Sequence, residues 1–228
     1  MKNKNAMIEK PKFLKPVLVC FILTVTSALY SADWSKEKEK DGITVFMRDV
    51  AGSNYREFRA QMTVNSSLSA LVAVLDDTES YCNWIYKCLN ASLLNKKQTS
   101  ETDIRYIHTI LDFSMLSSKR DTITRSVLTQ NKETKTIDIS LLGVPSFLPV
   151  SDDIVRIKKL TGFWKIEPKD SDIVEVTYQL HLEPGGNMTS WLVNSTLEDI
   201  GFETLKKMRE MIKSSKYKSS KFDHIKEP

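Results

Sequence analysis

The sequence predicts an α+β fold in which a curved antiparallel sheet wraps around a long C-terminal helix. Two observations support this prediction: strand-like segments follow one another through the middle of the chain, and one long helical segment comes after them. No β-α-β alternation is present, which excludes a doubly wound parallel sheet. A sheet that grips a single helix leaves an internal space between the two, which is a natural site for an apolar ligand.

The first part of the predicted domain is a hairpin followed by short helices. Residues 43–50 and 55–64 are strand-like and are joined by Ala-Gly-Ser-Asn, which is a hairpin signal. An Asn-Ser-Ser cap then precedes a helix over 68–75, whose leucines recur at helical spacing, and Asp76-Asp77 ends it. A second helical piece covers 79–86.

The strand candidates come next, and the terminal helix follows them. The strands are expected at 89–96, 104–112, 121–130, 136–142, 154–166 and 173–183. The last one alternates cleanly, with apolar residues from Val174 to Leu182 on one face and polar residues on the other, as in a sheet with one packed face. The turn Glu183-Pro-Gly-Gly-Asn ends the strands, and a helix runs from about Thr189 to Lys213.

Residues 1–28 have the layout of a secretory signal peptide: a lysine-bearing lead, a short apolar run and then small residues. Thr26-Ser27-Ala28 favours a cut after Ala28, although cleavage as late as residue 32 stays open, as does an uncleaved N-terminal anchor. We therefore expect an exported protein, periplasmic if the host is a Gram-negative bacterium and secreted otherwise.

The net charge of +4 comes from this leader, whose five lysines and one glutamate contribute 5 − 1 = +4. The charges of the remaining chain are balanced, which argues against a nucleic-acid partner.

The leader precedes a predicted ligand-binding domain over 33–213. The tail over 214–228 is Lys/Ser-rich and poor in apolar residues, so it is expected to be flexible.

Loss of Cys20 with the leader would leave Cys82 and Cys88, and an even pair in an oxidising compartment suggests a disulfide. Residues six apart on one helix are separated by about 9 Å of rise, so the bond requires the chain to leave the helix between them. Two buried thiols are the alternative.

Three cysteines and three histidines are too few for a Cys/His zinc cluster, so no metal is expected.

Three segments of the chain resemble the START (StAR-related lipid transfer) domain family. They are Ser117-Ser-Lys-Arg-Asp121; Val155-Arg156 with Gly162-Phe-Trp164-Lys-Ile166; and Tyr178 with Glu183-Pro-Gly-Gly186 and Trp191-Leu-Val-Asn194. The resemblance covers roughly 43–213 in the family's order. Thr189 or Ser190 stands where a proline is usual, and Ile200-Gly201-Phe202 lies where a proline often precedes Thr-Leu, which affects how the terminal helix begins and bends.

The resemblance implies a helix-grip fold with a tunnel for one lipid or sterol. Candidate ligand-binding residues are Arg120, Arg156, Trp164, Tyr178, Trp191, Asn194, Leu197 and Gly201. Each has a plainer interpretation: the arginines as partners of Asp121 in a structural ion pair, the tryptophans as core, and Gly201 as a site of tight helix–sheet packing. The apolar loop with Val144, Phe147 and Leu148 is expected at the tunnel mouth as a gate, or else as an ordinary cap on the core.

The sequence therefore predicts a carrier that binds one hydrophobic ligand and moves it between membranes through transient membrane contact, as a monomer and without cofactors. No nucleophile elbow, P-loop or dinucleotide fingerprint is present, so no catalytic residue is assigned. The alternatives are a small cyclase- or aromatase-like enzyme that uses the same cavity, because the wider superfamily includes such enzymes, and a ligand-gated interaction module.

Overall fold

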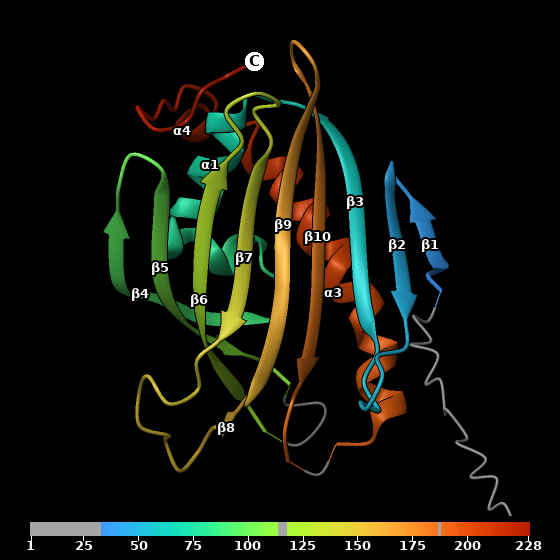
Figure 1. The fold of residues 1–228 in the computed structure, drawn as a ribbon. Coiled ribbons are helices and arrows are strands. Elements are labelled where there is room, and N and C mark those ends of the chain that lie inside the picture. The colour runs from blue at the N-terminus through green and yellow to red at the C-terminus, as the bar shows by residue number, and fades with distance from the viewer. Residues whose placement is uncertain (1–32, 114–117, 187) are drawn as a thin grey trace, which may run out of the picture. The chain divides into compact units, whose positions relative to one another are not determined.

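The computed structural model describes residues 33–113, 118–186 and 188–228 (Figure 1). The predicted signal peptide over 1–28 and its cleavage sites lie outside the described residues. Within the described part of the chain, none of the helices combines the length and the apolar composition needed to cross a membrane.

The described residues form a ten-stranded sheet in the order β1-β2-β3-β10-β9-β7-β6-β5-β4, with β8 beside β6 (Figure 1). The strands are β1 (Ser35–Lys40), β2 (Ile43–Arg48), β3 (Glu57–Asn65), β4 (Cys88–Gln98), β5 (Thr102–Leu111), β6 (Arg120–Gln130), β7 (Ile137–Gly143), β8 (Val155–Arg156), β9 (Lys159–Asp170) and β10 (Ile173–Glu183). Neighbours along this order are antiparallel, and the short β8 runs parallel to β6. The β2–β3 hairpin lies beside the last strand, because β3 pairs with β10.

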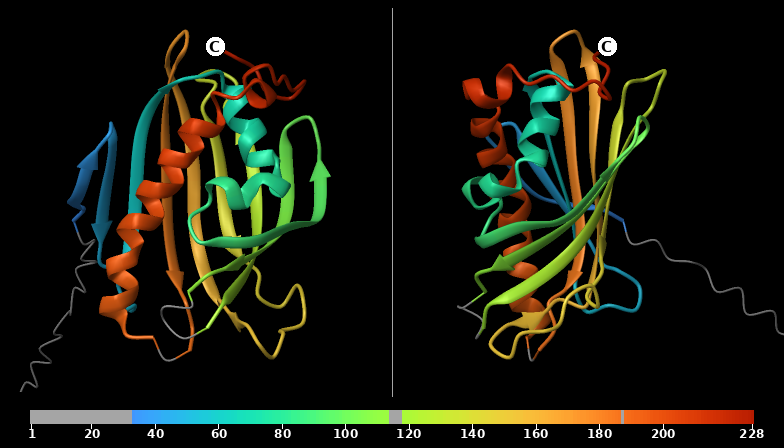
Figure 2. Two further views of the ribbon diagram at one scale, coloured as in Figure 1. Left: turned by 180° about the vertical axis from the view of Figure 1, so that it is seen from behind. Right: turned by 90° about the vertical axis from the view of Figure 1, so that its left-hand side faces the viewer.

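The helices lie together on one side of this sheet (Figure 2). They are α1 (Leu68–Asp76), the 3-10 turn η1 (Thr78–Ser80), α2 (Tyr81–Trp84), α3 (Ser190–Met211) and α4 (Ser215–Lys218). The long helix α3 packs mainly against β2 and β3, and α1 and α2 lie beside it. The predicted α+β architecture with a C-terminal helix gripped by the sheet is confirmed.

Gly201 lets α3 approach the sheet closely. A Cβ atom there would lie 2.9 Å from Cδ2 of Phe58 and 3.0 Å from Cβ of Ala60, so a larger residue would force β3 and α3 apart. Leu197, Leu205 and Met208 share this buried face of the helix. Gly201 therefore serves helix–sheet packing, as in the plainer of its two interpretations, and does not line a ligand cavity.

Two elements differ from the expected ones. Ser35–Lys40 is a strand although its sequence is almost wholly charged, because β1 is an exposed edge that pairs with β2 through its backbone. Lys38 from β1 reaches α3, where Nζ lies 2.9 Å from Oε1 of Glu198 and 4.7 Å from the centre of the Phe202 ring. The expected strand over 154–166 is divided at Ile157-Lys158 into β8 and β9.

The C-terminal tail is packed on the domain, which differs from the expected flexible segment. Tyr217 and Ile225 are buried with 3% and 4% of their surface exposed. Glu227 accepts hydrogen bonds at the N-terminus of α1 from the backbone N–H groups of Leu68 and Ser69, both at 2.9 Å, and from the Ser69 hydroxyl at 2.6 Å. Average composition concealed these few anchoring residues.

Replacing Glu227 by alanine should destabilise the domain by about 1–2 kcal/mol, because the first N–H groups of α1 would lose their acceptor. Urea denaturation followed by circular dichroism measures the change. Glu101→Ala is the matched control, since Glu101 is exposed and pairs with Lys132 in solvent, where loss of an ion pair changes stability by less than about 1 kcal/mol. Equal effects of the two substitutions would contradict the capping role.

Asp77 joins α4 to the helices at the start of the domain and should make stability depend on pH. Burial by itself would raise the pKa of Asp77, but hydrogen bonds from Lys216, Tyr217 and Ser80 outweigh it and lower the pKa to about 2. A carboxylate with a depressed folded-state pKa contributes stability above its unfolded pKa near 4, and loses it as the pH falls toward 2.

Wild type should therefore exceed Asp77→Asn in stability by about 1 kcal/mol at pH 6, and the difference should nearly vanish at pH 2. Urea denaturation of both proteins across this pH range measures it, with the exposed Asp153→Asn as control. A difference that stays constant with pH would show that the contact does not depend on the Asp77 charge.

Candidate ligand-binding cavity

An internal cavity lies between the inner face of the sheet and helices α1, α2 and α3. Its volume is about 130 Å³, which is below the range of typical ligand pockets, so the space is narrow. Most of the lining is apolar, including Val72, Leu75, Leu160 and Leu180.

Aromatic rings form one wall of the cavity. Trp164 on β9 and Tyr178 on β10 are directly opposite in the strand register, and their rings stack in parallel with centroids 3.9 Å apart. Trp84 from α2 meets the edge of Trp164 at 5.9 Å, and Tyr81 meets Trp84 at 5.2 Å. The structure thus places both Trp164 and Tyr178 in the cavity lining, as the sequence predicts.

The tyrosines of this wall stay protonated at neutral pH. Burial raises the pKa of Tyr81 to about 12 and raises the pKa of Tyr178 further still. The Tyr81 hydroxyl donates to the carbonyl oxygen of Leu75 at 2.7 Å. These phenols are therefore hydrogen-bond donors rather than bases.

Polar side chains from β5 and β6 form a second wall of the cavity, on the same inner face of the sheet and beyond β7. Asp103 and Arg105 are buried, and two guanidinium nitrogens of Arg105 donate to Oδ2 of Asp103 at 3.2 and 2.5 Å. Burial tends to lower the pKa of Arg105, but the contacts with Asp103 and Asp76 outweigh it and raise that pKa. Oδ1 of Asp103 has no hydrogen-bond partner among the described residues. The hydroxyl-bearing members of this wall are Thr109, Thr122, Thr124 and Ser126.

Arg156 forms a buried ion pair away from the cavity. Its Nε and Nη2 atoms donate to Oδ1 and Oδ2 of Asp121 at 2.8 and 2.9 Å. Burial alone would raise the pKa of Asp121, but hydrogen bonds from Arg156 and His108 outweigh it and lower that pKa. Arg156 also donates to carbonyl oxygens of the preceding loop, at Pro145, Leu148 and Pro149. The structural interpretation of Arg156 holds, and its expected place in the ligand site does not.

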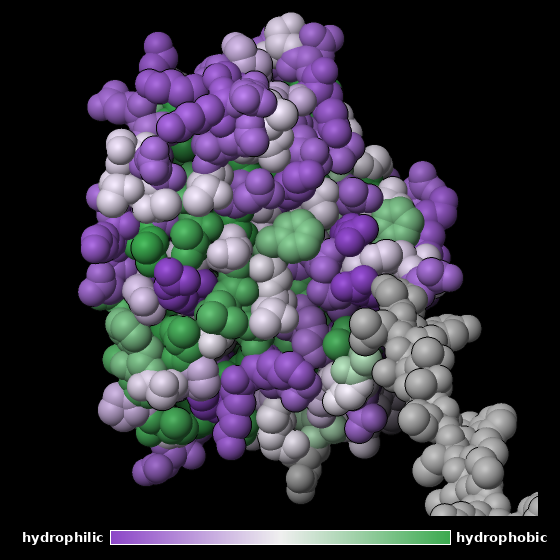
Figure 3. All heavy atoms as spheres, viewed as in Figure 1, coloured by the Kyte–Doolittle hydropathy of each residue, from purple (hydrophilic) through white to green (hydrophobic). Residues whose placement is uncertain are grey.

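The loop expected to gate the cavity lies elsewhere. Alternate residues of β5 from Asp103 to Leu111 line the cavity, so Tyr106 points to the opposite face of the sheet. Phe147 stacks on Tyr106 there, with ring centroids 4.5 Å apart. Figure 3 shows apolar side chains gathered on this outer face over β5, β6 and β7. Val144, Phe147 and Leu148 therefore do not line the cavity.

The remaining predicted residues also lie outside the cavity lining. Arg120 is buried at the start of β6 and donates to the carbonyl oxygen of Ser118. Trp191 is 70% exposed on the first turn of α3, and Leu197 belongs to the buried core. Asn194 accepts a hydrogen bond from the backbone N–H of Arg56 at 2.9 Å, so it fixes the end of the first hairpin. Arg120, Leu197 and Asn194 thus have structural contacts, and the exposed Trp191 lies apart from the cavity.

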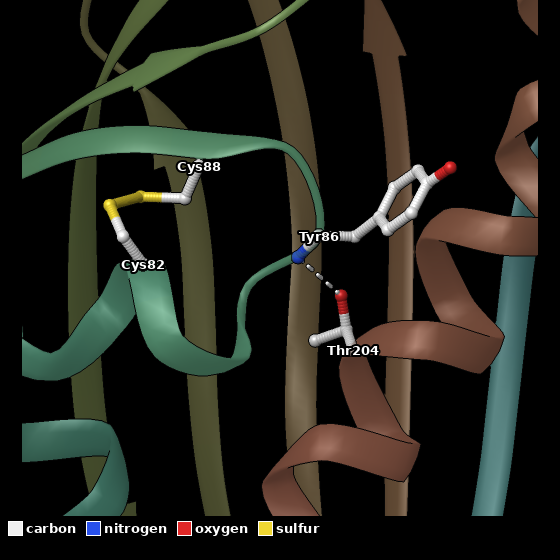
Figure 4. Close-up of a disulfide and its surroundings, with 4 residues drawn as sticks. All are labelled: Cys82, Tyr86, Cys88 and Thr204. Atoms are coloured by element: carbon white, nitrogen blue, oxygen red, sulfur yellow. Dashed lines mark hydrogen bonds between the residues drawn. A yellow bond between two sulfur atoms is a disulfide. The ribbon is translucent and has the colours of Figure 1, made fainter.

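The disulfide joins α2 to the start of β4 and closes a loop whose residues Ile85 and Tyr86 line the cavity. Cys82 and Cys88 are bonded, with 2.04 Å between the sulfur atoms, and the chain leaves the helix between them because α2 ends at Trp84 (Figure 4). The disulfide prediction is confirmed. The enclosed loop holds Tyr86, whose backbone N–H donates to the Thr204 hydroxyl of α3 at 3.2 Å. Ile85, Tyr86 and Ile200 are half-buried members of the lining, so the cavity nears the surface here.

Sequence reasoning missed the polar wall of the cavity. Its signal was present, since alternate positions of β5 and β6 carry Asp, Arg, Thr and Ser on the face that the register turns inward. The polar face of an antiparallel strand is normally assigned to the solvent side of the sheet. In β5 and β6 the polar face lies toward the cavity instead. Among the described residues, no His/Cys/Asp/Glu group suited to hold a metal ion is found.

Comparisons with known proteins agree with this geometry. A crystal structure of a STAR-related lipid transfer protein from Xanthomonas axonopodis is similar with a TM-score of 0.72 and 32% identity, covering 79% of this chain and 99% of that one. Human STARD10 shares the fold at a TM-score of 0.67 and 18% identity, over 80% of this chain and 74% of that one. An uncharacterized protein of Pseudomonas aeruginosa, PA1579, is 30% identical over 85% of this chain and 93% of its own length. The family model of the START domain matches residues 25–218, and the chain therefore belongs to the START domain family.

Proposed function

We propose that this protein binds one hydrophobic ligand, a lipid or sterol, in the cavity between the sheet and the helices, and transfers it between membranes. The observation that carries the proposal is the enclosed, largely apolar lining around Trp164 and Tyr178. Apolar ligand surface kept from water there contributes about 25 cal/mol per Å², which favours the bound state of a ligand with a large apolar body over the ligand free in water. Its relative from Xanthomonas axonopodis is described as a lipid transfer protein, which supports the same activity here.

Transfer requires contact with a membrane, and the outer face of the sheet is our candidate surface. Leu142, Phe147 and Val150 are 48%, 42% and 61% exposed. Leu142 follows the cavity-lining Leu141 and therefore lies on the outer face, where Phe147 stacks on Tyr106. Exposed apolar side chains that cluster in this way are typical of interaction surfaces. We further propose that the protein acts as a monomer outside the cytoplasm, because the leader over 1–28 resembles a signal peptide and the disulfide suits an oxidising compartment.

Binding is favoured over turnover by the chemistry of the lining. Tyr81 and Tyr178 have raised pKa values and do not act as bases at neutral pH. Asp103, the carboxylate of the lining, is engaged by Arg105 at 2.5 Å. Its Oδ1 stays open, so Asp103 is the group of the described lining that an enzyme of the cyclase type could use as a base.

Filling the cavity should abolish uptake without unfolding the domain. Thr124 is a half-buried member of the lining on β6, so Thr124→Phe places a ring in the narrow space. Thr129→Phe is the matched control, since Thr129 lies on the same strand and is exposed. Uptake of a fluorescent sterol and of a fluorescent phospholipid from vesicles measures binding, and circular dichroism checks the fold.

We expect Thr124→Phe to reduce uptake at least tenfold and Thr129→Phe to match the wild type. Equal uptake by the wild type and a folded Thr124→Phe variant would show that ligands bind elsewhere. No uptake by the wild type from either kind of vesicle would contradict the proposed function itself.

A further inference from the structure

The polar wall of the cavity is continuous along two neighbouring strands. Thr109 lies directly opposite Thr122, Ile107 opposite Thr124, Arg105 opposite Ser126, and Asp103 opposite Leu128 in the β5–β6 register. At least one member of every pair is polar. From Thr122 to Ser126 the stripe runs for about 13 Å along the strand, so it is a side of the cavity and not a single polar end.

The polar groups of this wall face the cavity. Oδ1 of the buried Asp103 has no hydrogen-bond partner among the described residues. Thr109 and Ser126 are 7% and 8% exposed and turn their side chains to the cavity. The hydroxyls of Thr122 and Thr124 approach each other at a long 3.4 Å. Buried polar groups are nearly always hydrogen-bonded in folded proteins, so a ligand that excludes water from this wall must itself supply partners to these groups.

An acyl chain, or a sterol with one hydroxyl, satisfies such a group at one end only and lays hydrocarbon against the rest of the stripe. Beyond β7, on the same inner face of the sheet, the stacked rings of Trp164 and Tyr178 offer an apolar surface. The two walls together are therefore suited to a molecule with one oxygenated side and one hydrocarbon side.

We infer that the ligand is a facially amphipathic amphiphile: a rigid, fused-ring, steroid- or terpenoid-like molecule that carries several hydroxyls along one side. The inference rests on the proposed function, because it names the ligand class of the same cavity. Rigidity matters, since fused rings hold their hydroxyls on one side without loss of conformational freedom on binding. The hydroxyls of the ligand exchange hydrogen bonds with Thr109, Thr122, Thr124 and Ser126, and one donates to Oδ1 of Asp103.

The test compares two uncharged ligands that differ only in hydroxyls on one side. The tetrol 5β-cholane-3α,7α,12α,24-tetrol has two ring hydroxyls more than 5β-cholane-3α,24-diol, and both are titrated into the full chain by calorimetry. The double variant Thr109→Val, Ser126→Ala removes two hydroxyls of the wall with little change of shape, and thermal unfolding verifies that the variant keeps its fold.

We expect the wild type to bind the tetrol at least tenfold more tightly than the diol, and the double variant to lose most of this preference by binding the tetrol more weakly. Equal affinities in the wild type, or a preference for the tetrol that the double variant retains, would overturn the inference while leaving a cavity that binds hydrophobic ligands. If neither ligand binds and vesicle uptake is absent as well, the proposed function fails and the inference fails with it.

Discussion

The close packing of α3 on β3 fixes the position of everything else in the domain. A Cβ atom at position 201 would lie within 3.0 Å of the Phe58 ring and of Ala60, so the helix can pack this closely only with glycine there. Lys38 of β1 adds an ion pair with Glu198 of the same helix. With α3 bound to the β2–β3 side, one helix cannot also cover β5, β6 and β7. The short helices α1 and α2 span that part, and the cavity is the space that remains beneath them.

Most of the architecture could be predicted because local patterns and global fold agree. The alternation in β10 and the helical spacing of α3 each allow one structure, and the cysteine spacing required the break in the helix that follows Trp84. β1 could not be predicted, because its charged residues carry no apolar alternation and its pairing depends on β2 alone. The tail was misjudged because Tyr217, Ile225 and Glu227 anchor it while the surrounding lysines and serines dominate its composition.

The candidate site was predicted in part, for a physical reason. Trp164 and Tyr178 lie in the lining because strand alternation places them on the inner face. Arg156 matched a pattern that the fold requires. It pairs with Asp121 and donates hydrogen bonds to three carbonyl oxygens of the preceding loop. Sequence patterns record structural and ligand-binding needs alike, and only the three-dimensional arrangement separates them. The inward-facing Asp103 and Arg105 were missed because a polar strand face is normally the solvent face.

We propose that the cavity of this START domain holds one hydrophobic ligand. Native mass spectrometry of the full chain, purified from its own host without detergent, tests it most directly when the released molecule is then identified. The account predicts one small molecule per chain, with an apolar body and several oxygens. A protein that is empty as purified, and that takes up nothing from vesicles made with the host's own lipids, would contradict it.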